Sequence, residues 1–237
     1  MKNRTTIVIA SLVTACSAGI AMADGIVYIT GAPVGSKYDG SIGGTFAINR
    51  VSGDVGSPNV FGGVTANQFL TFCIEPRAAL RSNINFYAQI ATSSAHGTNS
   101  NDTANTNPLS SITAKLYREF TDQGDFGRVG SFANGYTTTA QTDAIQNAIW
   151  AAQGQVAVSS LTGDSLALYN WAKSNQNGLK GVRVLRLWAN SSGGVYSVNI
   201  QDQLTMIPLP PAAWAGLGTL GCLLGASHIR RRKLAAA

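Results

Sequence analysis

Between its two apolar ends, the chain shows a strand-like pattern first and a helix-like pattern second. Four runs separated by Gly and Ser clusters predict strands over residues 25–30, 45–51, 69–75 and 83–93. In the last run, Ile84, Phe86, Ala88 and Ile90 alternate with Asn83, Asn85, Tyr87 and Gln89, which is the two-residue period of a half-buried strand. Residues 96–108 are polar and have no period, so we expect an exposed loop there.

Helical segments follow the loop. Residues 110–123 present an apolar face after a capping serine, either Ser110 or Ser111, and further helices are expected over residues 139–153 and 164–175. Residues 182–188 and 196–200 then predict a hairpin with its turn at residues 191–194. Strands at both ends with helices between them predict an α+β fold. We expect one β-rich domain over residues 24–206, with a mixed or antiparallel sheet and about three helices.

The N-terminal segment has the order of a secretory signal peptide. Lys2 and Arg4 precede an apolar stretch, and Ala21-Met22-Ala23 has the small-x-small pattern of a signal-peptidase site. We therefore expect residues 1–23 to be removed on export. An alternative is that Val13-Thr14-Ala15-Cys16 acts as a lipobox, which would make Cys16 a lipidated N-terminus.

Residues 207–237 combine a proline motif, a short apolar run and a basic cluster. The motif is Pro208, Leu209, Pro210 and Pro211, and the cluster is Arg230, Arg231, Arg232 and Lys233. The apolar run between them, from Ala212 to Ile229, is just long enough to cross a bilayer, and the basic cluster would stay on the cytoplasmic side. On hydropathy alone, this tail is equally an ordinary C-terminal transmembrane anchor.

The order of these three parts resembles the PEP-CTERM sorting signals that exosortases process, in particular the variant with a V-P-L-P-A core. Leu209 stands where the P-E-P core has glutamate. The resemblance implies a Gram-negative-type envelope, an exosortase-like partner, and cleavage near residues 208–211. It also implies anchoring in the inner membrane before processing, then release to the cell surface or extracellular matrix.

Once both ends are removed, the chain carries no net charge. It has 17 Lys and Arg against 11 Asp and Glu, but six of the positive residues lie in the two terminal segments, which leaves 11 against 11. Nucleic-acid binding needs clustered Lys and Arg, so we expect no nucleic-acid partner. Low charge with much Gly, Ser, Thr and Asn fits a secreted surface protein instead.

Cys73 is the one cysteine of the expected mature domain, since Cys16 lies in the signal peptide and Cys222 in the tail. An unpaired cysteine in an exported protein is intermolecular, reactive or simply buried. Alternation along residues 69–75 places Cys73 on one face with Thr71 and Glu75, so it need not be a core residue.

Gln146 lies beside an apolar stripe of the second expected helix, three and four residues before Ile149 and Trp150. Attack of the Cys73 thiolate on the Gln146 amide, with loss of ammonia, would give a thioester that persists where water is excluded. An incoming amine would displace the sulfur and leave a stable amide. This is nucleophilic acyl chemistry that is consumed in one event.

Phe72-Cys73-Ile74, followed much later by Gln146-x-Ala148-Ile149-Trp150, resembles the paired motifs of thioester domains in Gram-positive surface adhesins. Ile145 stands where that family has threonine. The resemblance implies that Cys73 and Gln146 are cross-linked, and that the domain attaches covalently to an amine-bearing surface protein or matrix polymer. It covers roughly residues 25–200 in the order of elements.

Two other functions remain open. The domain could be a non-reactive structural component of a biofilm matrix, with Cys73 a small buried hydrophobe. An enzyme is the weakest option and we expect none, since the acidic residues are scattered and His96 is the single histidine of the mature domain. No Cys, His or Asp cluster has metal-ligand spacing and no Gly-rich phosphate loop occurs, so we expect no cofactor.

Overall fold

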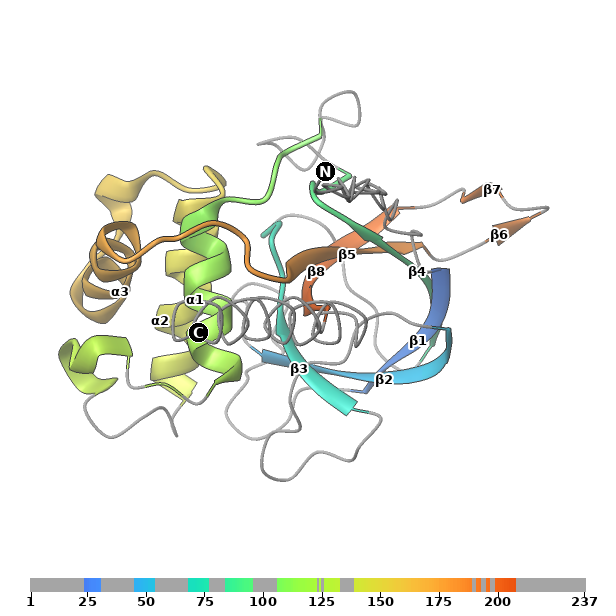
Figure 1. The fold of residues 1–237 in the computed structure, drawn as a ribbon, viewed down its shortest axis with the longest axis horizontal. Helices are drawn as coiled ribbons and strands as arrows, with labels where there is room; N and C mark the ends of the chain where they lie inside the picture. The colour runs from blue at the N-terminus through green and yellow to red at the C-terminus, as the bar shows by residue number, and fades with distance from the viewer. Residues whose placement is uncertain are drawn as a thin grey trace, which may run out of the picture.

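The fold combines a curled antiparallel sheet with a layer of helices, as the computed structural model shows (Figure 1). The structure describes residues 24–30, 45–53, 68–76, 84–95, 106–122, 124, 126–132, 139–188, 191–192, 195–196 and 199–207. Within these residues the prediction of an α+β domain is confirmed. The sheet is wholly antiparallel, which settles the choice between a mixed and an antiparallel sheet.

The main sheet has six strands in the order β3-β2-β1-β4-β5-β8. Their bounds are β1 Asp24–Thr30, β2 Thr45–Gly53, β3 Gln68–Phe72, β4 Asn85–Ala91, β5 Val182–Trp188 and β8 Asn199–Met206. The first four come from one half of the chain and the last two from its far end. The helical segment between β4 and β5 therefore returns the chain to the same sheet.

The sheet closes on itself, because its two edge strands meet. An antiparallel bridge joins Cys73, directly after β3, to Gln203 in β8. Beside it, the Ile74 N–H donates to the Asp202 carbonyl at 3.1 Å. The Thr71 hydroxyl adds a third link, since it accepts from the Leu204 N–H at 2.9 Å and donates to the Leu204 carbonyl at 2.6 Å. Closure leaves fewer unpaired strand edges.

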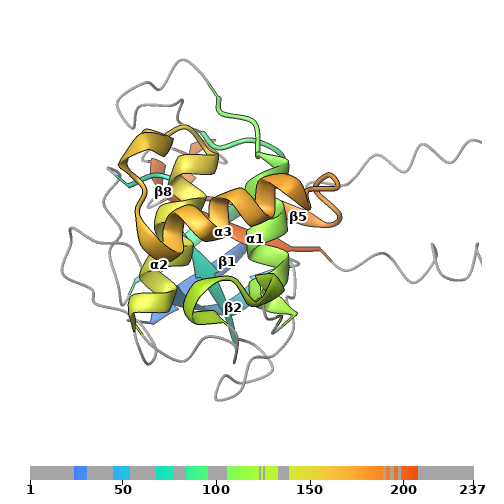
Figure 2. The ribbon, with the colours of Figure 1, turned by 90° about the vertical axis from the view of Figure 1, so that its left-hand side faces the viewer.

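The helices cover one side of the sheet, with α1 and α2 next to it and α3 lying across their outer side (Figures 1 and 2). They are α1 Ser111–Thr121, α2 Thr139–Ala152 and α3 Gly163–Ser174, with the 3₁₀ turns η1 Phe126–Arg128, η2 Gly130–Phe132 and η3 Val158–Ser160. The Ser110 hydroxyl caps α1 by accepting from the Ile112 N–H at 3.1 Å. All three predicted helices are thus confirmed, with ends that differ by one to a few residues.

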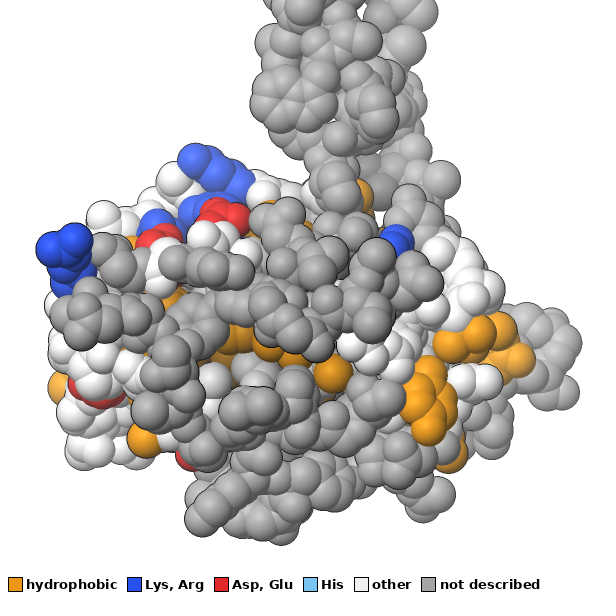
Figure 3. Space-filling view, turned by 90° about the horizontal axis from the view of Figure 1, so that it is seen from below, with side chains coloured by type: hydrophobic (Ala, Val, Ile, Leu, Met, Phe, Trp, Pro, Cys, Tyr) orange, Lys and Arg blue, Asp and Glu red, His pale blue; other side chains and the backbone are white. Residues whose placement is uncertain are grey.

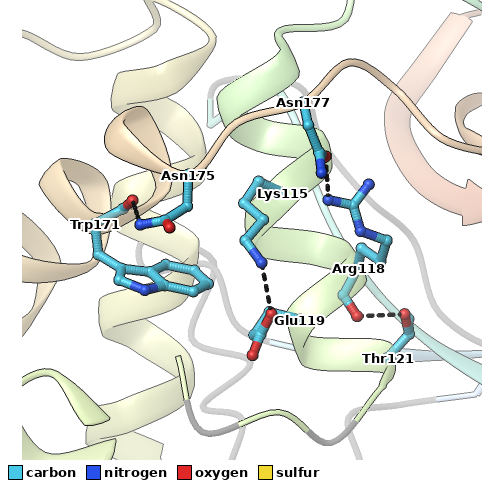
Figure 4. Close-up of polar contacts among 7 residues, drawn as sticks. All are labelled: Lys115, Arg118, Glu119, Thr121, Trp171, Asn175 and Asn177. Carbon is cyan, nitrogen blue, oxygen red and sulfur yellow. Dashed lines mark hydrogen bonds and ion pairs between the residues drawn. The ribbon is translucent and has the colours of Figure 1, made fainter. Parts of the chain in front are cut away.

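Polar contacts hold the outer side of this layer together (Figure 4). Lys115 and Glu119 form an ion pair one turn apart on α1, at 2.9 Å. The Lys115 ammonium also lies 4.6 Å from the centre of the Trp171 ring on α3. Arg118 donates to Asn177 beyond the end of α3 at 2.7 Å. The contacts of Lys115 with Trp171 and of Arg118 with Asn177 join α1 to α3 and the residues after it.

Two apolar clusters make up the core, one between helices and sheet and one inside the closed sheet. Strand β3 and the residues after it contribute to both. Phe72 and Ile74 face the helices, whereas Phe69 and Cys73 face the interior. The predicted alternation of faces along residues 69–75 is therefore confirmed.

The predicted final hairpin differs from the observed one in its second strand. β5 pairs with β8, from Trp188 opposite Asn199 to Val182 opposite Met206. Tyr196 belongs instead to a small separate ribbon of β6 Ser191–Ser192 and β7 Val195–Tyr196. The strand was expected to end at Ile200; in the structure the polar residues Gln201 to Gln203 continue it.

The alternation predicted for the fourth strand holds except at its start. Phe86 and Ala88 are fully buried and Tyr87 is exposed, as expected for a half-buried strand. Ile84, predicted to face inward, precedes β4 and is 39% exposed. Most of the predicted loop over residues 96–108 lies outside the described residues, and a bridge between Ser93 and Pro108 joins its two ends.

Among the described residues seen in Figure 3, the Lys and Arg side chains lie mostly at one end, with Asp and Glu side chains among them. Residues 1–23, the motif at residues 208–211 and the basic cluster at residues 230–233 lie outside the described residues. In the described part of the chain, no helix is long and apolar enough to cross a bilayer.

Candidate functional site

Cys73 lies where one strand pairing has ended and another begins. Pairing between β2 and β3 runs only as far as Thr45 opposite Phe72. The N–H of Ile74 points to β8, so the N–H and C=O of Cys73 point to the opposite side of the strand. Among the described residues, β2 supplies no partner on that side, and the N–H and C=O of Cys73 bind a side chain instead.

The side-chain amide of Gln146 fills this place. Its Oε1 accepts from the Cys73 N–H at 3.2 Å, and its Nε2 donates to the Cys73 carbonyl at 2.7 Å. The Cys73 thiol donates to the same Oε1 at 3.3 Å. The opposite amide orientation would set donor against donor, so these contacts define which atom is oxygen. Two residues 73 positions apart in the chain thus meet through three hydrogen bonds.

Helix α2 is buried on most of its sides, and this packing places Gln146 beside Cys73. Ile145, Ala148 and Ile149 face the core between helices and sheet, while Trp150, one turn after Gln146, joins the cluster inside the closed sheet. Gln146 has no exposed surface. A polar side chain buried in this way needs hydrogen-bond partners. Among the described residues, Cys73 makes all three hydrogen bonds of the Gln146 amide.

Cys73 is a core residue, a question that its polar neighbours on the strand had left open. It is 1% exposed, and Thr71 and Glu75 on the same face have no exposed surface. Both faces of this segment are covered, one by the helices and the other by the interior of the closed sheet. Sequence alternation separates two faces of a strand, but it does not reveal a second covered face.

Burial raises the pKa of the Cys73 thiol far above its ordinary value, because no water solvates the thiolate. The indole of Trp150 acts in the opposite direction and lowers the pKa, whereas the carboxylate of Glu75 raises it further. The resting sulfur is therefore a neutral thiol. A sulfur in this environment is also a poor leaving group, which protects any acyl bond formed on it.

The arrangement of atoms suits attack of sulfur on the amide carbon. The sulfur lies 3.3 Å from the oxygen bonded to that carbon, so the thiol and the amide are in contact before any reaction. The Cys73 N–H already points at Oε1, the atom that gains negative charge in a tetrahedral intermediate. A fixed backbone donor at that position stabilises such charge.

Glu75, two residues after Cys73, and Asp202 of β8 form a second buried polar group. The Asp202 N–H donates to Glu75 Oε2 at 3.3 Å, and the Asp202 carboxyl accepts from the Ala95 N–H at 2.6 Å and the Leu187 N–H at 3.4 Å. Burial, and then the Glu75 charge, raise the pKa of Asp202. Arg186 lies near enough to lower it.

Sequence reasoning missed Asp202 and Gln203 as neighbours of Cys73. Their signal was the polar run Gln201-Asp202-Gln203, which resembles a solvent-facing linker before the proline motif. Within the described residues, no group of three His, Cys, Asp or Glu side chains is placed to hold a metal ion. The described residues thus offer the Cys73–Gln146 pair and its polar surroundings as the candidate site.

Comparison with known proteins adds no relative to this picture. No protein-family model matches the chain, and no curated protein or solved structure is significantly similar to it.

Proposed function

We propose that this chain is an exported cell-surface or extracellular-matrix protein that attaches once, covalently, to an amine-bearing partner through a Cys73–Gln146 thioester. The observation that carries the proposal is the contact between the Cys73 thiol and the Gln146 carbonyl oxygen, at 3.3 Å between two fully enclosed side chains. The contact supports the proximity of sulfur and amide that the reaction needs, and the burial supports the exclusion of water that would preserve the thioester.

The chemistry balances without an oxidant or cofactor. In the first step the sulfur–carbon bond forms, the carbon–nitrogen bond of the amide breaks, and the thiol proton leaves with the nitrogen as ammonia. In the second step a primary amine bonds to the same carbon, the sulfur departs, and one amine proton returns to Cys73. The product is a secondary amide on Gln146 and a free thiol.

The flanking segments complete the proposal. A signal peptide at residues 1–23 would export the domain, and a PEP-CTERM-like tail at residues 207–237 would hold it in the inner membrane until an exosortase-like enzyme cuts near residues 208–211. Arg230, Arg231, Arg232 and Lys233 would orient the span. The mature domain, with its balanced charge, would then reach the cell surface or matrix.

Intact mass of the exported protein tests the thioester. The full chain is expressed in a Gram-negative host and purified after export, and its mass is compared with the mass calculated for the ends found by peptide mapping. We expect a mass lower by one ammonia, and incorporation of one methylamine on Gln146 when that amine is added. The same spectra report whether the chain begins at Asp24 and ends near Pro208 to Pro211.

Gln146→Glu is the test variant and Gln153→Glu its matched control. Both change a buried glutamine of the same region to its acid, but Gln153 binds the Ser110 N–H and the Thr113 hydroxyl instead of Cys73. Methylamine incorporation should be lost with the first change and kept with the second. A wild-type protein at full calculated mass, with Cys73 alkylated as a free thiol, would reject the thioester.

The high thiol pKa and complete burial favour one other function. In that case Gln146 is a structural side chain that completes the hydrogen bonding of Cys73, and the protein is a non-reactive component of a biofilm matrix sorted by the same tail. Attachment of cells to matrix would then be unchanged by Gln146→Glu, provided that this variant remains folded.

A further inference from the structure

The indole N–H of Trp150 is a buried donor without a hydrogen-bond partner. Trp150 is 6% exposed, and its Nε1 is enclosed with no acceptor in hydrogen-bond geometry among the described residues. Native proteins seldom leave a buried donor unpaired, since it loses its hydrogen bonds to water on folding and gains none. The residues around the Trp150 ring should therefore explain why its N–H is unpaired.

The surroundings of this ring are those of the thiol. Trp150 lies one helical turn after Gln146 on α2, and residues at that spacing share a face of the helix. Its side chain packs in the same buried cluster as Cys73, inside the closed sheet. The indole is near enough to the sulfur to favour the thiolate over the thiol, although it makes no hydrogen bond of ordinary geometry with it.

The unpaired indole N–H and its lowering effect on the Cys73 pKa are both explained if the N–H binds a charged sulfur. A neutral thiol is a weak acceptor, and its own proton is directed at Gln146 Oε1. A thiolate is a much stronger acceptor and would draw the N–H into a proper hydrogen bond. The interaction is then worth more when sulfur gains negative charge than at rest, which is the condition for accelerating a reaction.

We propose that Trp150 is a catalytic residue of the thioester chemistry, whose indole N–H binds the sulfur of Cys73 while that sulfur carries negative charge. The inference rests on the proposed function and extends it to a residue with a defined task. During amine attack, the carbon–sulfur bond breaks and the electron pair stays on sulfur. The N–H stabilises that charge until a proton from the amine reaches the sulfur, and Trp150 itself loses no proton.

The backbone of the same site supplies a second hydrogen-bond donor. The Cys73 N–H points at Gln146 Oε1, and the indole N–H is assigned to the sulfur by the proposal, so each of the two atoms that gain charge would have its own donor. Both donors belong to rigid groups, a peptide and an aromatic ring, and neither must be withdrawn from water. Preorganised donors of this kind need no reorganisation when the charge develops.

Trp150→Phe tests the proposal, because it removes the N–H and keeps an aromatic ring of similar shape. We expect methylamine incorporation into the full exported chain to be about ten- to a hundredfold slower, the range for one hydrogen bond to a charged group. Trp171→Phe is the matched control, since Trp171 contacts Phe126 and Lys115 on the other side of the helical layer. It should react at the wild-type rate, and equal rates for all three proteins would overturn the proposal.

A second measurement decides the matter without any thioester. In a Gln146→Ala background, where none can form, the indole N–H resonance of Trp150 is followed by NMR as Cys73 is replaced by Ala. The Trp150 resonance should shift, while that of Trp171 should not. An unmoved Trp150 resonance would show that the indole does not lie against residue 73, and this would overturn its role even if ammonia loss is found in the wild type. A shifted resonance without ammonia loss would instead reject the proposed function alone.

Discussion

Cys73 and Gln203 lie opposite each other in the antiparallel bridge that joins the two edge strands of the sheet. The residue that carries the thiol is therefore also a residue of the closure. On one side Cys73 faces β8, and on the other its N–H and C=O bind Gln146 from α2. The closure of the sheet and the position of the candidate site thus depend on the same few contacts.

Removal of the Gln146 side chain should destabilise the fold whether or not a thioester forms. Gln146→Ala leaves the N–H and C=O of Cys73 buried without their partner and opens a cavity in a fully enclosed place. We expect the free energy of unfolding to fall by about 2–4 kcal/mol, as for other buried polar groups left unpaired. Urea denaturation in the Cys73→Ala background, which prevents any cross-link, measures this directly.

Asn147→Ala is the control for that experiment, because Asn147 is the next residue of α2 and is only half-buried. Its loss should change the free energy of unfolding by about 0.5 kcal/mol or less, the usual range for surface positions. If both variants unfold at the same urea concentration, the amide of Gln146 contributes nothing to the closure.

Thr71→Val should open the closure without touching the reactive pair. The Thr71 hydroxyl both accepts from and donates to the backbone of Leu204, which makes it a substitute for a missing strand partner. Valine keeps the shape and leaves two buried backbone groups unpaired, so we expect a loss of about 1–3 kcal/mol. Thr71→Ser keeps the hydroxyl and should recover most of this stability in the same denaturation experiment.

Amide hydrogen exchange tests the same contact between Thr71 and Leu204. The Leu204 amide should exchange faster in Thr71→Val, while the Val184 amide, within the pairing of β5 with β8 and β4, should keep its protection. Equal protection of Leu204 in the two proteins would show that the hydroxyl does not join the strands.

Gly127 should tolerate alanine less well than Gly163. Both have positive φ, 67° and 52°, so a side chain at either place costs about 1–3 kcal/mol of backbone strain. A Cβ at Gly127 would in addition lie 2.2 Å from Nε1 of Trp171, whereas nothing lies within 4 Å at Gly163. Trp171 cannot move aside easily, because it packs edge-on against Phe126. The melting temperature should therefore fall more for Gly127→Ala, and equal decreases would contradict the contact.

The local elements were predictable because their signals lie within a few neighbouring residues. Ser110, one of the two serines expected as the cap, caps α1, and alternation along residues 69–75 gave the two faces on which Phe72 and Cys73 lie. The pairing of Cys73 with Gln146 was suggested by a resemblance of short motifs, and residue spacing alone could not place two side chains from distant segments in contact.

Closure of the sheet was not predictable, and without it the sequence left open whether Cys73 is buried. Gln201, Asp202 and Gln203 have the composition of an exposed linker, yet they form a central part of β8 because Cys73, Ile74 and Glu75 supply their partners. A polar strand becomes buried only when its hydrogen bonds are met by another segment. That segment is more than a hundred residues away, where periodicity gives no information.

Asp202 should make the stability of the fold depend on pH. Its pKa in the folded protein is raised well above 3.8, first by burial and then by the charge of Glu75, while the nearby Arg186 opposes this. In the folded state the carboxyl therefore keeps its proton at pH values where the unfolded chain has lost it. Its contribution is complete below pH 3.8 and is lost as pH rises through the folded pKa. Within that window stability should fall by about 1.4 kcal/mol per pH unit.

Asp202→Asn removes the titrating group and should remove this slope. Asparagine offers one acceptor fewer to the Ala95 and Leu187 amides, so the whole curve is lowered by an amount that does not change with pH. The difference between the two free energies of unfolding should therefore shrink as pH rises, when both are measured by urea denaturation from pH 4 upward. Glu75→Gln should shorten the window, because loss of its charge lowers the folded pKa of Asp202. Parallel curves for wild type and Asp202→Asn would mean that the folded carboxyl titrates as it does in the unfolded chain, and the buried acid beside Cys73 would then be ionised.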